Sequence, residues 1–343
     1  MDQRIFDPRP AANPETLAVQ PLLPGADLPL LVTPKDGALD DGGWRNLLPD
    51  IHAVVRDRLP VAGGLLFRGF GLHGDAPFRA FAESFGRPLL DYDFGSTPRS
   101  AVDKGVYTST EYPAHQSIPL HNEQAYTLQW PQTIWFHCVT AAATGGATPI
   151  ADSRLVARRI DPAIRARFAA KRLMYVRNYG NGLDLPWQRA FNTDDPAEVE
   201  RFCRANAIAW EWTEDGELRT RQICQAVARH PVTGEEVWFN QAHLFHVSNL
   251  PPAVRDSLLA VVEDESELPR HVFYGDGTPI EDEALDHIRA VLDECTRSFP
   301  WQDGDVMMLD NMLAAHGREP FTGRRKVVVA MADPVRSPDL PAA

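Results

Sequence analysis

Apolar positions along this chain follow two periods, one typical of amphipathic helices and the other of buried strands. Between Trp44 and Leu59 they recur every three or four residues, which is the spacing of one helical face. Asp161-Pro162 has the form of an N-cap followed by a proline in the first turn, so it predicts the beginning of another helix. The pattern predicts helices over residues 44–59, 77–85, 161–170, 197–206, 252–262 and 281–297.

Short runs rich in β-branched and aromatic residues predict strands between these helices. Val232-Thr233-Gly234 predicts a hairpin, and His316-Gly317 predicts a turn between two late strands. Strands come early, in the middle and at the end, without the regular alternation of strand and helix that a parallel sheet requires. This order favours a β-sandwich or jelly roll decorated with helices. The predicted strands are residues 65–70, 133–139, 173–176, 223–229, 237–240, 306–309 and 326–331.

Changes in composition along the chain predict one large domain with two terminal extensions. Residues 1–42 are rich in Pro, Gly and Asp, and we expect them to form an arm that lies over the domain. The domain is expected over residues 43–335, followed by a tail over residues 336–343. We expect the segment from about residue 177 to about residue 300 to be an insert that acts as a lid. Gly180-Asn181-Gly182 lies near the beginning of this insert.

The net charge, the lack of long apolar runs and the spacing of the cysteines exclude several classes of protein. Of 343 residues, 34 are Lys or Arg and 47 are Asp or Glu, and the net charge of −13 repels a phosphate backbone, so nucleic-acid binding is not expected. No apolar run approaches the roughly 18 residues of a membrane span, and residues 1–10 lack the apolar core of a secretory signal. The four scattered cysteines are typical of a reducing compartment, so we expect a cytoplasmic protein without disulfides.

A histidine followed two residues later by a carboxylate occurs twice. After His73-Gly74-Asp75 a helix is predicted, so we expect Asp75 to act as its N-cap. In His121-Asn122-Glu123, residues i and i+2 of a strand lie on the same face, so the imidazole and the carboxylate can reach one metal ion. A solvated ion pair on the strand is the alternative interpretation of this second match.

A third ligand must come from elsewhere in the chain, and His316 is the best candidate because Asp310-Asn311 leads into it. Two histidines, one carboxylate and open coordination positions are typical of non-haem Fe(II) oxygenases, whereas structural zinc usually has thiolate ligands. Such an iron works with a chelating co-substrate, whose far carboxylate needs a cation. Arg324 or Arg325 could bind it with two hydrogen bonds, although both could instead belong to a surface ion network.

These residues, taken in order, resemble the taurine dioxygenase-like (TauD/TfdA) family of Fe(II)/2-oxoglutarate-dependent oxygenases. The resemblance implies an α+β protein built on a clavaminate synthase-like double-stranded β-helix, with Fe(II) as the metal and 2-oxoglutarate and O₂ as co-substrates. The matching stretches cover most of residues 60–335, and they are residues 63–70 with 81–88, 119–126, 144–152 and 305–331.

The resemblance also implies roles for particular residues. It makes His121, Glu123 and His316 the iron ligands, and it assigns Thr148 and Arg325 to the binding of 2-oxoglutarate. The ligand Glu123 stands where much of the family has aspartate. A carboxylate at this position argues against the related halogenases, which have alanine there.

Segments 119–123, 175–179 and 237–241 are similar to the syringomycin-pathway-type branch of the family. That branch hydroxylates amino acids, in some cases while they are tethered to a carrier protein. The resemblance therefore implies a small amino-acid-derived substrate of natural-product biosynthesis, free or presented by a carrier protein. Ser117, Arg177 and Asn240 are candidate substrate contacts, but Arg177, Asn240 and the adjacent Gln241 could equally satisfy buried backbone groups.

Three alternatives to this function are left open. A catabolic dioxygenase of a small sulfonate or aryloxy acid would share the whole site. A zinc hydrolase could share the three ligands but has no evident use for Thr148 and Arg325, and a jelly-roll binding module is expected to have lost one of the five residues. Assembly into a homo-oligomer is also left open. Of the other histidines, His243 and His246 are expected to pack or to line a pocket rim, and His137 is expected in the core.

Overall fold

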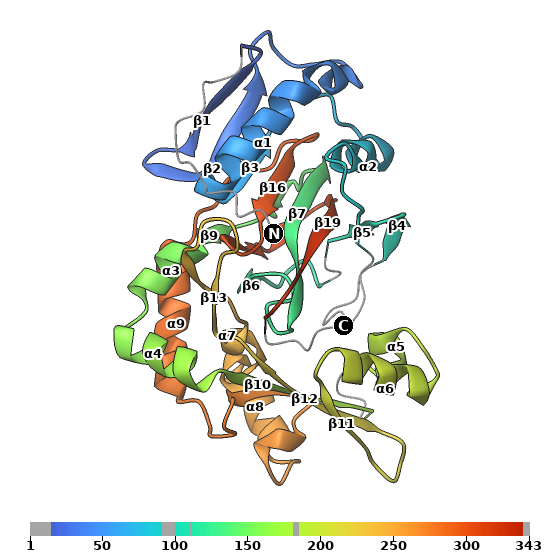
Figure 1. The fold of residues 1–343 in the computed structure, drawn as a ribbon, viewed down its shortest axis with the longest axis vertical. Coiled ribbons are helices and arrows are strands. Elements are labelled where there is room, and N and C mark those ends of the chain that lie inside the picture. Colours follow the sequence, from blue (N-terminus) through green and yellow to red (C-terminus); the bar gives the residue numbers. More distant parts are fainter. Residues whose placement is uncertain (1–14, 91–99, 110–111, 181–184, 339–343) are drawn as a thin grey trace.

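An eight-stranded sheet forms the larger half of a jelly roll at the centre of the protein (Figure 1). The computed structural model describes residues 15–90, 100–109, 112–180 and 185–338. Neighbouring strands are antiparallel except for the parallel pair β2 and β3. In spatial order the strands are β1 (Leu17–Leu23), β2 (Ala26–Pro34), β3 (Gly64–Phe67), β16 (Val306–Asp310), β7 (Gln129–Thr140), β19 (Lys326–Arg336), β5 (Val106–Thr108) and β4 (Ala101–Asp103).

Two small sheets pack against the large one and complete the jelly roll. The first contains β6 (Ile118–His121), β17 (Ala314–Arg318) and β9 (Ile150–Asp152), and the second pairs β18 (Phe321–Thr322) with β8 (Thr144–Gly145). Ile150 and Ala314 of the first small sheet share an apolar core with Phe136 and Val329 of the large sheet. The jelly roll predicted from the sequence is therefore confirmed.

Alternation along the strands of the large sheet directs side chains into two separate cores. In β16, Met307 and Leu309 belong to the core between the sheets, whereas Val306 and Met308 belong to the core on the outer face. The outer core is covered by α1 (Leu48–Ala62) and α2 (Asp75–Glu83), which match two of the predicted helices (Figure 1).

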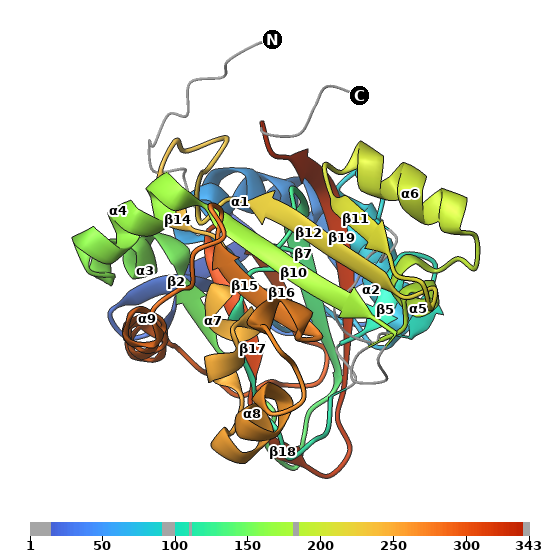
Figure 2. The same cartoon turned by 90° about the horizontal axis from the view of Figure 1, so that it is seen from below.

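A four-stranded sheet beside the jelly roll belongs to the long insert. Its spatial order is β11 (Ala209–Trp212), β12 (Leu218–Cys224), β10 (Leu173–Tyr179) and β15 (Arg270–Tyr274). Figure 2 shows β10 and β12 running across the jelly roll when the molecule is seen from below. The predicted hairpin is β13 (Val227–Arg229) and β14 (Glu236–Trp238). The remaining helices are η1 (Gly43–Leu47), α3 (Ser153–Arg159), α4 (Pro162–Lys171), α5 (Trp187–Phe191), α6 (Pro196–Ala205), α7 (Ala242–Phe245), η2 (Val247–Asn249), α8 (Pro252–Leu259), η3 (Glu265–Glu267) and α9 (Asp282–Cys295).

Two expectations about the N-terminal half are wrong. Residues 17–34 were expected in an arm, but they form β1 and β2 and extend the large sheet, because prolines and glycines hide the strand pattern there. The N-cap of α2 is Gly74, and Asp75 lies in the first turn, where its carboxylate forms an ion pair with Lys326. Asn181 and Gly182, expected at the beginning of the lid, lie outside the described residues.

The turn predicted at His316-Gly317 is also wrong, since both residues lie inside β17. The pairing of β17 with β6 shifts register between His316 and Arg318, as in a β-bulge. A Cβ atom on Gly317 would lie 2.5 Å from the carbonyl oxygen of Ile118. The glycine therefore serves a close approach of two strands, not a change of chain direction.

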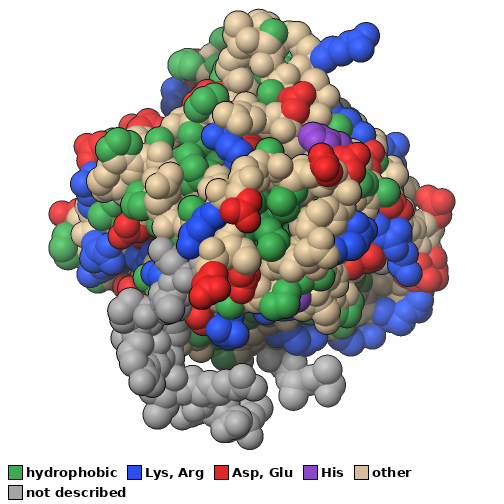
Figure 3. All heavy atoms as spheres, turned by 90° about the horizontal axis from the view of Figure 1, so that it is seen from above, with side chains coloured by type: hydrophobic (Ala, Val, Ile, Leu, Met, Phe, Trp, Pro, Cys, Tyr) green, Lys and Arg blue, Asp and Glu red, His purple; other side chains and the backbone are tan. Residues whose placement is uncertain are grey.

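The surface of the described residues has charged side chains of both signs. Figure 3 shows acidic and basic side chains interspersed over one face of the molecule. No helix in the described part of the chain is long and apolar enough to cross a membrane.

The N-cap residue of α4, Asp161, allows the contribution of helix capping to stability to be tested. The Asp161 carboxylate accepts hydrogen bonds from the N–H groups of Ala163 at 2.8 Å and Ile164 at 3.3 Å. Asp161→Ala removes this acceptor, so we expect the free energy of unfolding to fall by about 1 kcal/mol in urea denaturation. Asp161→Asn retains a cap and should stay close to wild type. An equal loss in both variants would mean that charge, not capping, is the stabilising factor.

Candidate active site

Strand pairing brings two distant histidines together at the centre of the small sheet. His121 of β6 and His316 of β17 are direct register partners, and their ring centroids lie 4.5 Å apart. Glu123 follows two residues after β6 ends, and its side chain reaches the same point. One donor atom from each of the three residues lies within 4.8 Å of the others, in the only such cluster among the described residues. Three converging nitrogen and oxygen donors can bind one metal ion.

The imidazole of His121 is oriented by the backbone. Its Nδ1 lies 2.9 Å from the carbonyl oxygen of Pro119. Because a carbonyl can only accept, Nδ1 carries the proton, and Nε2 keeps its lone pair for a metal. Glu123 and His316 are both almost fully buried, which protects such a centre from bulk water.

The segment around α7 braces the strand that carries His121. The Gln241 amide Nε2 donates to the carbonyl of Asn122 at 2.8 Å, and His243 Nε2 lies 2.8 Å from the carbonyl of Leu120. Burial lowers the pKa of His243 to about 4, so its ring is neutral at physiological pH and donates this hydrogen bond from Nε2. The two bonds hold the carbonyl groups of the residues on both sides of His121.

Asn311 clamps the backbone of Glu123 from the opposite side. Its Oδ1 accepts the Glu123 N–H at 2.7 Å, and its Nδ2 donates to the Glu123 carbonyl at 2.9 Å and to the Pro131 carbonyl at 2.8 Å. The preceding Asp310 is held in turn by His230, whose Nε2 lies 2.9 Å from a carboxylate oxygen. The Asp310-Asn311 pair of the sequence therefore fixes the main chain of one candidate ligand.

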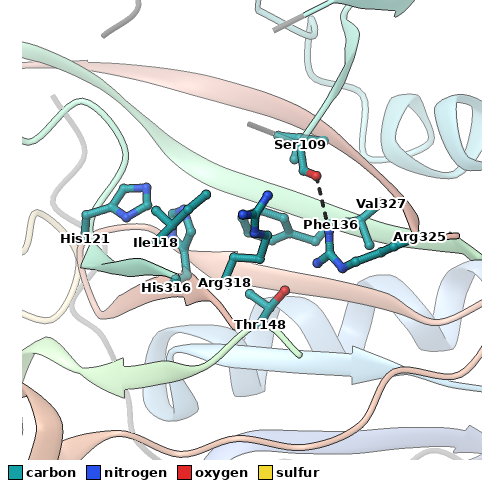
Figure 4. A pocket seen from close by; sticks show the side chains of 11 residues that line it. Ser109, Ile118, His121, Phe136, Thr148, His316, Arg318, Arg325 and Val327 are labelled. Carbon is teal, nitrogen blue, oxygen red and sulfur yellow. Dashed lines mark hydrogen bonds between the residues drawn. The ribbon is translucent and has the colours of Figure 1, made fainter. Parts of the chain in front are cut away.

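A narrow cavity of about 30 Å³ adjoins the two histidines (Figure 4). Thr148 and Arg325 both line it, and the Thr148 hydroxyl accepts a hydrogen bond from Trp301 Nε1 at 3.1 Å. Arg325 Nε donates to the Gly146 carbonyl at 2.9 Å, whereas Arg324 is exposed. Burial, with a smaller contribution from Arg318, lowers the pKa of Arg325 to about 10, so it stays charged at neutral pH. The cavity can accept a carboxylate.

Gly146 permits this position of Arg325. A Cβ atom on Gly146 would lie 3.0 Å from Arg325 Cδ, and the φ of +72° lies in the left-handed region that favours glycine. The glycines that precede Thr148 therefore make room for the arginine.

A larger cavity of about 810 Å³ opens on the other side of His121 and Glu123. Ser117 lines it, as do Gln241 and Phe245 from the insert. Among the described lining residues of the two cavities, neither Arg177 nor Asn240 appears. The Asn240 side chain donates to the Ala226 carbonyl and accepts from the Ala242 N–H, so it satisfies buried backbone groups. Of the three candidate substrate contacts, therefore, only Ser117 lines a cavity beside the candidate metal ligands.

Other histidines have the structural roles expected of them. His137 is fully buried with its Nδ1 3.1 Å from the Asp305 carbonyl, and His246 packs against His271 with ring centroids 4.5 Å apart.

Sequence reasoning missed Arg318 and Trp301, which contact the narrow cavity or its threonine. Arg318 could have been found, because it stands two residues after His316 and alternate residues of a strand share a face.

A jelly roll that gathers two histidines, a glutamate and a partly buried arginine suits Fe(II) and a chelating carboxylate, since these donors match both groups. The chain is an enzyme of the non-haem Fe(II)/2-oxoglutarate-dependent oxygenase class. Its particular family follows from the sequence: the pattern of the Taurine catabolism dioxygenase TauD, TfdA family matches residues 26–331, and the chain belongs to that family. The family predicted from the motifs is thus confirmed.

Comparison with known proteins gives relatives over nearly the whole chain. The chain is 45% identical over 319 residues to the dapdiamide synthesis protein DdaC of Enterobacter agglomerans, covering 92% of this chain and 94% of that protein. It is 31% identical over 287 residues to a clavaminate synthase-like protein of Arabidopsis thaliana, covering 80% and 82%. The solved structure of PvcB from Pseudomonas aeruginosa shares the fold with a TM-score of 0.55 and 17% identity over 96% of both chains.

The clamp on Glu123 leads to a prediction about the metal centre. Asn311→Ala leaves a buried N–H and two buried carbonyls without partners, at a cost of about 1–3 kcal/mol for each group. We expect weaker Fe(II) binding and a lower melting temperature, measured by metal titration and calorimetry. Asn46→Ala, at an exposed position of η1, is the control. Unchanged Fe(II) affinity in Asn311→Ala would show that the position of Glu123 does not depend on the clamp.

Proposed function

We propose that His121, Glu123 and His316 bind Fe(II) on one side of the jelly roll. The observation that carries this assignment is the convergence of their donor atoms within 4.8 Å beside a cationic cavity. The iron, when bound with 2-oxoglutarate, supplies the oxidising chemistry. The protein supplies the orientation of the ligands, through Pro119 and Asn311, and a site from which water is excluded.

In this proposal the narrow cavity is the co-substrate site. Arg325 binds the far carboxylate of 2-oxoglutarate, and the Thr148 hydroxyl donates a second hydrogen bond to it. Both side chains line the cavity that His121 and His316 also line, so one molecule can span from the metal to the arginine. A charged guanidinium is well suited to a carboxylate because the two groups can form two parallel hydrogen bonds with each other.

The substrate occupies the larger cavity, on the side of the metal that Glu123 and Gln241 face. We propose that it is derived from an amino acid and is oxidised in natural-product biosynthesis. This is supported by the 45% identity to a protein named for dapdiamide synthesis, and by the amide and hydroxyl groups of Gln241, Gln116 and Ser117 along the cavity wall. Presentation of the substrate on a carrier protein is part of the proposal. We further propose a cytoplasmic location, since the four cysteines form no disulfide.

The reaction class is tested by co-substrate turnover. We expect the Fe(II) protein to convert 2-oxoglutarate to succinate only in the presence of O₂, and faster with its substrate than without it. His316→Ala should abolish this, because two ligands do not hold the iron in place. His73→Ala, at an exposed histidine, should be nearly silent. Hydrolysis supported by zinc, with no succinate formed, would contradict the proposal.

The choice of arginine is tested separately. Arg325→Ala should retain iron but weaken 2-oxoglutarate binding by about 2–5 kcal/mol, or roughly 30-fold to several thousand-fold. Arg325→Lys should recover only part of the loss, since an ammonium cannot reproduce the two parallel bonds. The measurement is an anaerobic titration that follows the metal-to-ligand charge-transfer band. A collapse of affinity in Arg324→Ala, with Arg325→Ala unaffected, would mean that the wrong arginine was chosen.

A further inference from the structure

Arg318 is a buried cation of the active site that the proposed function does not use. It ends β17 two residues after His316 and lines the narrow cavity together with Arg325 and Thr148. Only 6% of its surface is exposed. In the view of Figure 4 its side chain stands between His316 and Arg325.

The outer end of the Arg318 guanidinium is bound to a loop of the larger cavity. Nη1 donates to the carbonyl of Tyr112 at 2.9 Å, and Nη2 donates to the carbonyls of Pro113 and Gln116, both at 2.8 Å. We call residues 112–117 the wall loop, because Tyr112, Gln116 and Ser117 all line the larger cavity. One side chain thus connects the narrow cavity with a loop that lines the larger one.

The inner end of the guanidinium has an unused donor. Arg318 Nε is buried and, within the described residues, has no hydrogen-bond partner. Arg318 and Arg325 both stack on the ring of Phe321, with guanidinium carbons 5.3 Å and 5.4 Å from its centroid. In the described part of the chain neither guanidinium forms an ion pair with a carboxylate. A buried cation and a partly buried one share this ring, so the two guanidinium groups repel each other until an anion enters.

We propose that Arg318 is a second cationic contact for 2-oxoglutarate and couples its binding to the order of the wall loop. This inference rests on the proposed function of the narrow cavity. The dianion neutralises both arginines, and Arg318 Nε donates a charge-assisted hydrogen bond to it. The bound guanidinium then holds the carbonyls of Tyr112, Pro113 and Gln116 in one place. The substrate cavity is accordingly complete only after the co-substrate is in position.

The test measures co-substrate affinity and loop order in the same protein. Arg318→Gln should weaken 2-oxoglutarate binding about 10- to 100-fold in the anaerobic Fe(II) titration, the range of one hydrogen bond to a charged group. In wild type, 2-oxoglutarate should slow amide hydrogen exchange at residues 114–117, and Arg318→Gln should lose this slowing. Arg318→Lys should recover part of the affinity but not the slowing, because one ammonium cannot hold three carbonyls. Arg324→Gln, at an exposed arginine close in sequence, is the matched control.

Two outcomes would overturn the inference. The first is wild-type affinity in Arg318→Gln, and the second is exchange at residues 114–117 that 2-oxoglutarate does not change in the wild-type protein. The second result needs no variant, so it decides the matter even if Arg318→Gln fails to fold. If Arg325→Ala loses affinity while Arg318→Gln does not, only this inference fails. If neither substitution changes 2-oxoglutarate binding, the proposed co-substrate site itself is wrong.

Discussion

The pairing of β6 with β17 is the constraint on which the site depends. It sets His121 directly opposite His316, and no other contact in the described structure brings these two rings together. The strands must come unusually close at this point, so a glycine is required at Gly317. Asn311 and the α7 segment add hydrogen bonds on the two flanks of this pair, which limits the movement of the ligand-bearing backbone. Two of the three candidate ligands are thus held by the sheet, and the third by a turn whose backbone Asn311 fixes.

The jelly roll and the insert contribute different parts of the candidate active site. All three candidate ligands, and the arginine and threonine of the narrow cavity, belong to the jelly roll and its connections. The insert contributes Gln241, Leu244 and Phe245, which form part of the larger cavity. Because Gln241 also holds the peptide next to His121, a change in the substrate wall acts directly on the ligand strand. This arrangement allows the insert to vary with the substrate while the oxidising centre stays the same.

Much of the fold and of the candidate site could be predicted from the sequence. The predictions that were wrong or incomplete have physical causes. The spacing of His121 and Glu123 and the Asp310-Asn311 pair before His316 pointed to the three candidate ligands, whereas Thr148 and the choice of Arg325 came from the resemblance to the family. The alternation argument was incomplete for Glu123, since β6 ends at His121 and the next residues form a turn. Gly317 was misread because a glycine for close approach and a glycine for a turn look identical in a sequence. The role of Asn240 was left open because its hydrogen bonds to Ala226 and Ala242 cannot be seen in a sequence, and Arg318 was missed although its spacing from His316 pointed to the same face of the strand.

The two candidate histidine ligands lie on neighbouring strands that are far apart in the sequence, so metal binding there would be linked to the folding equilibrium. β6 comes before the insert and β17 after it, so the ligand set exists only when the late strands have docked. A ligand that binds only the native state stabilises it by RT ln(1 + [L]/Kd), which is about 2.7 kcal/mol at a concentration of 100 Kd. Fe(II) bound to the proposed ligands would therefore stabilise the pairing of an early strand with a late one. Without the metal this stabilisation would be absent from the strand pair that also forms part of the wall of the narrow cavity.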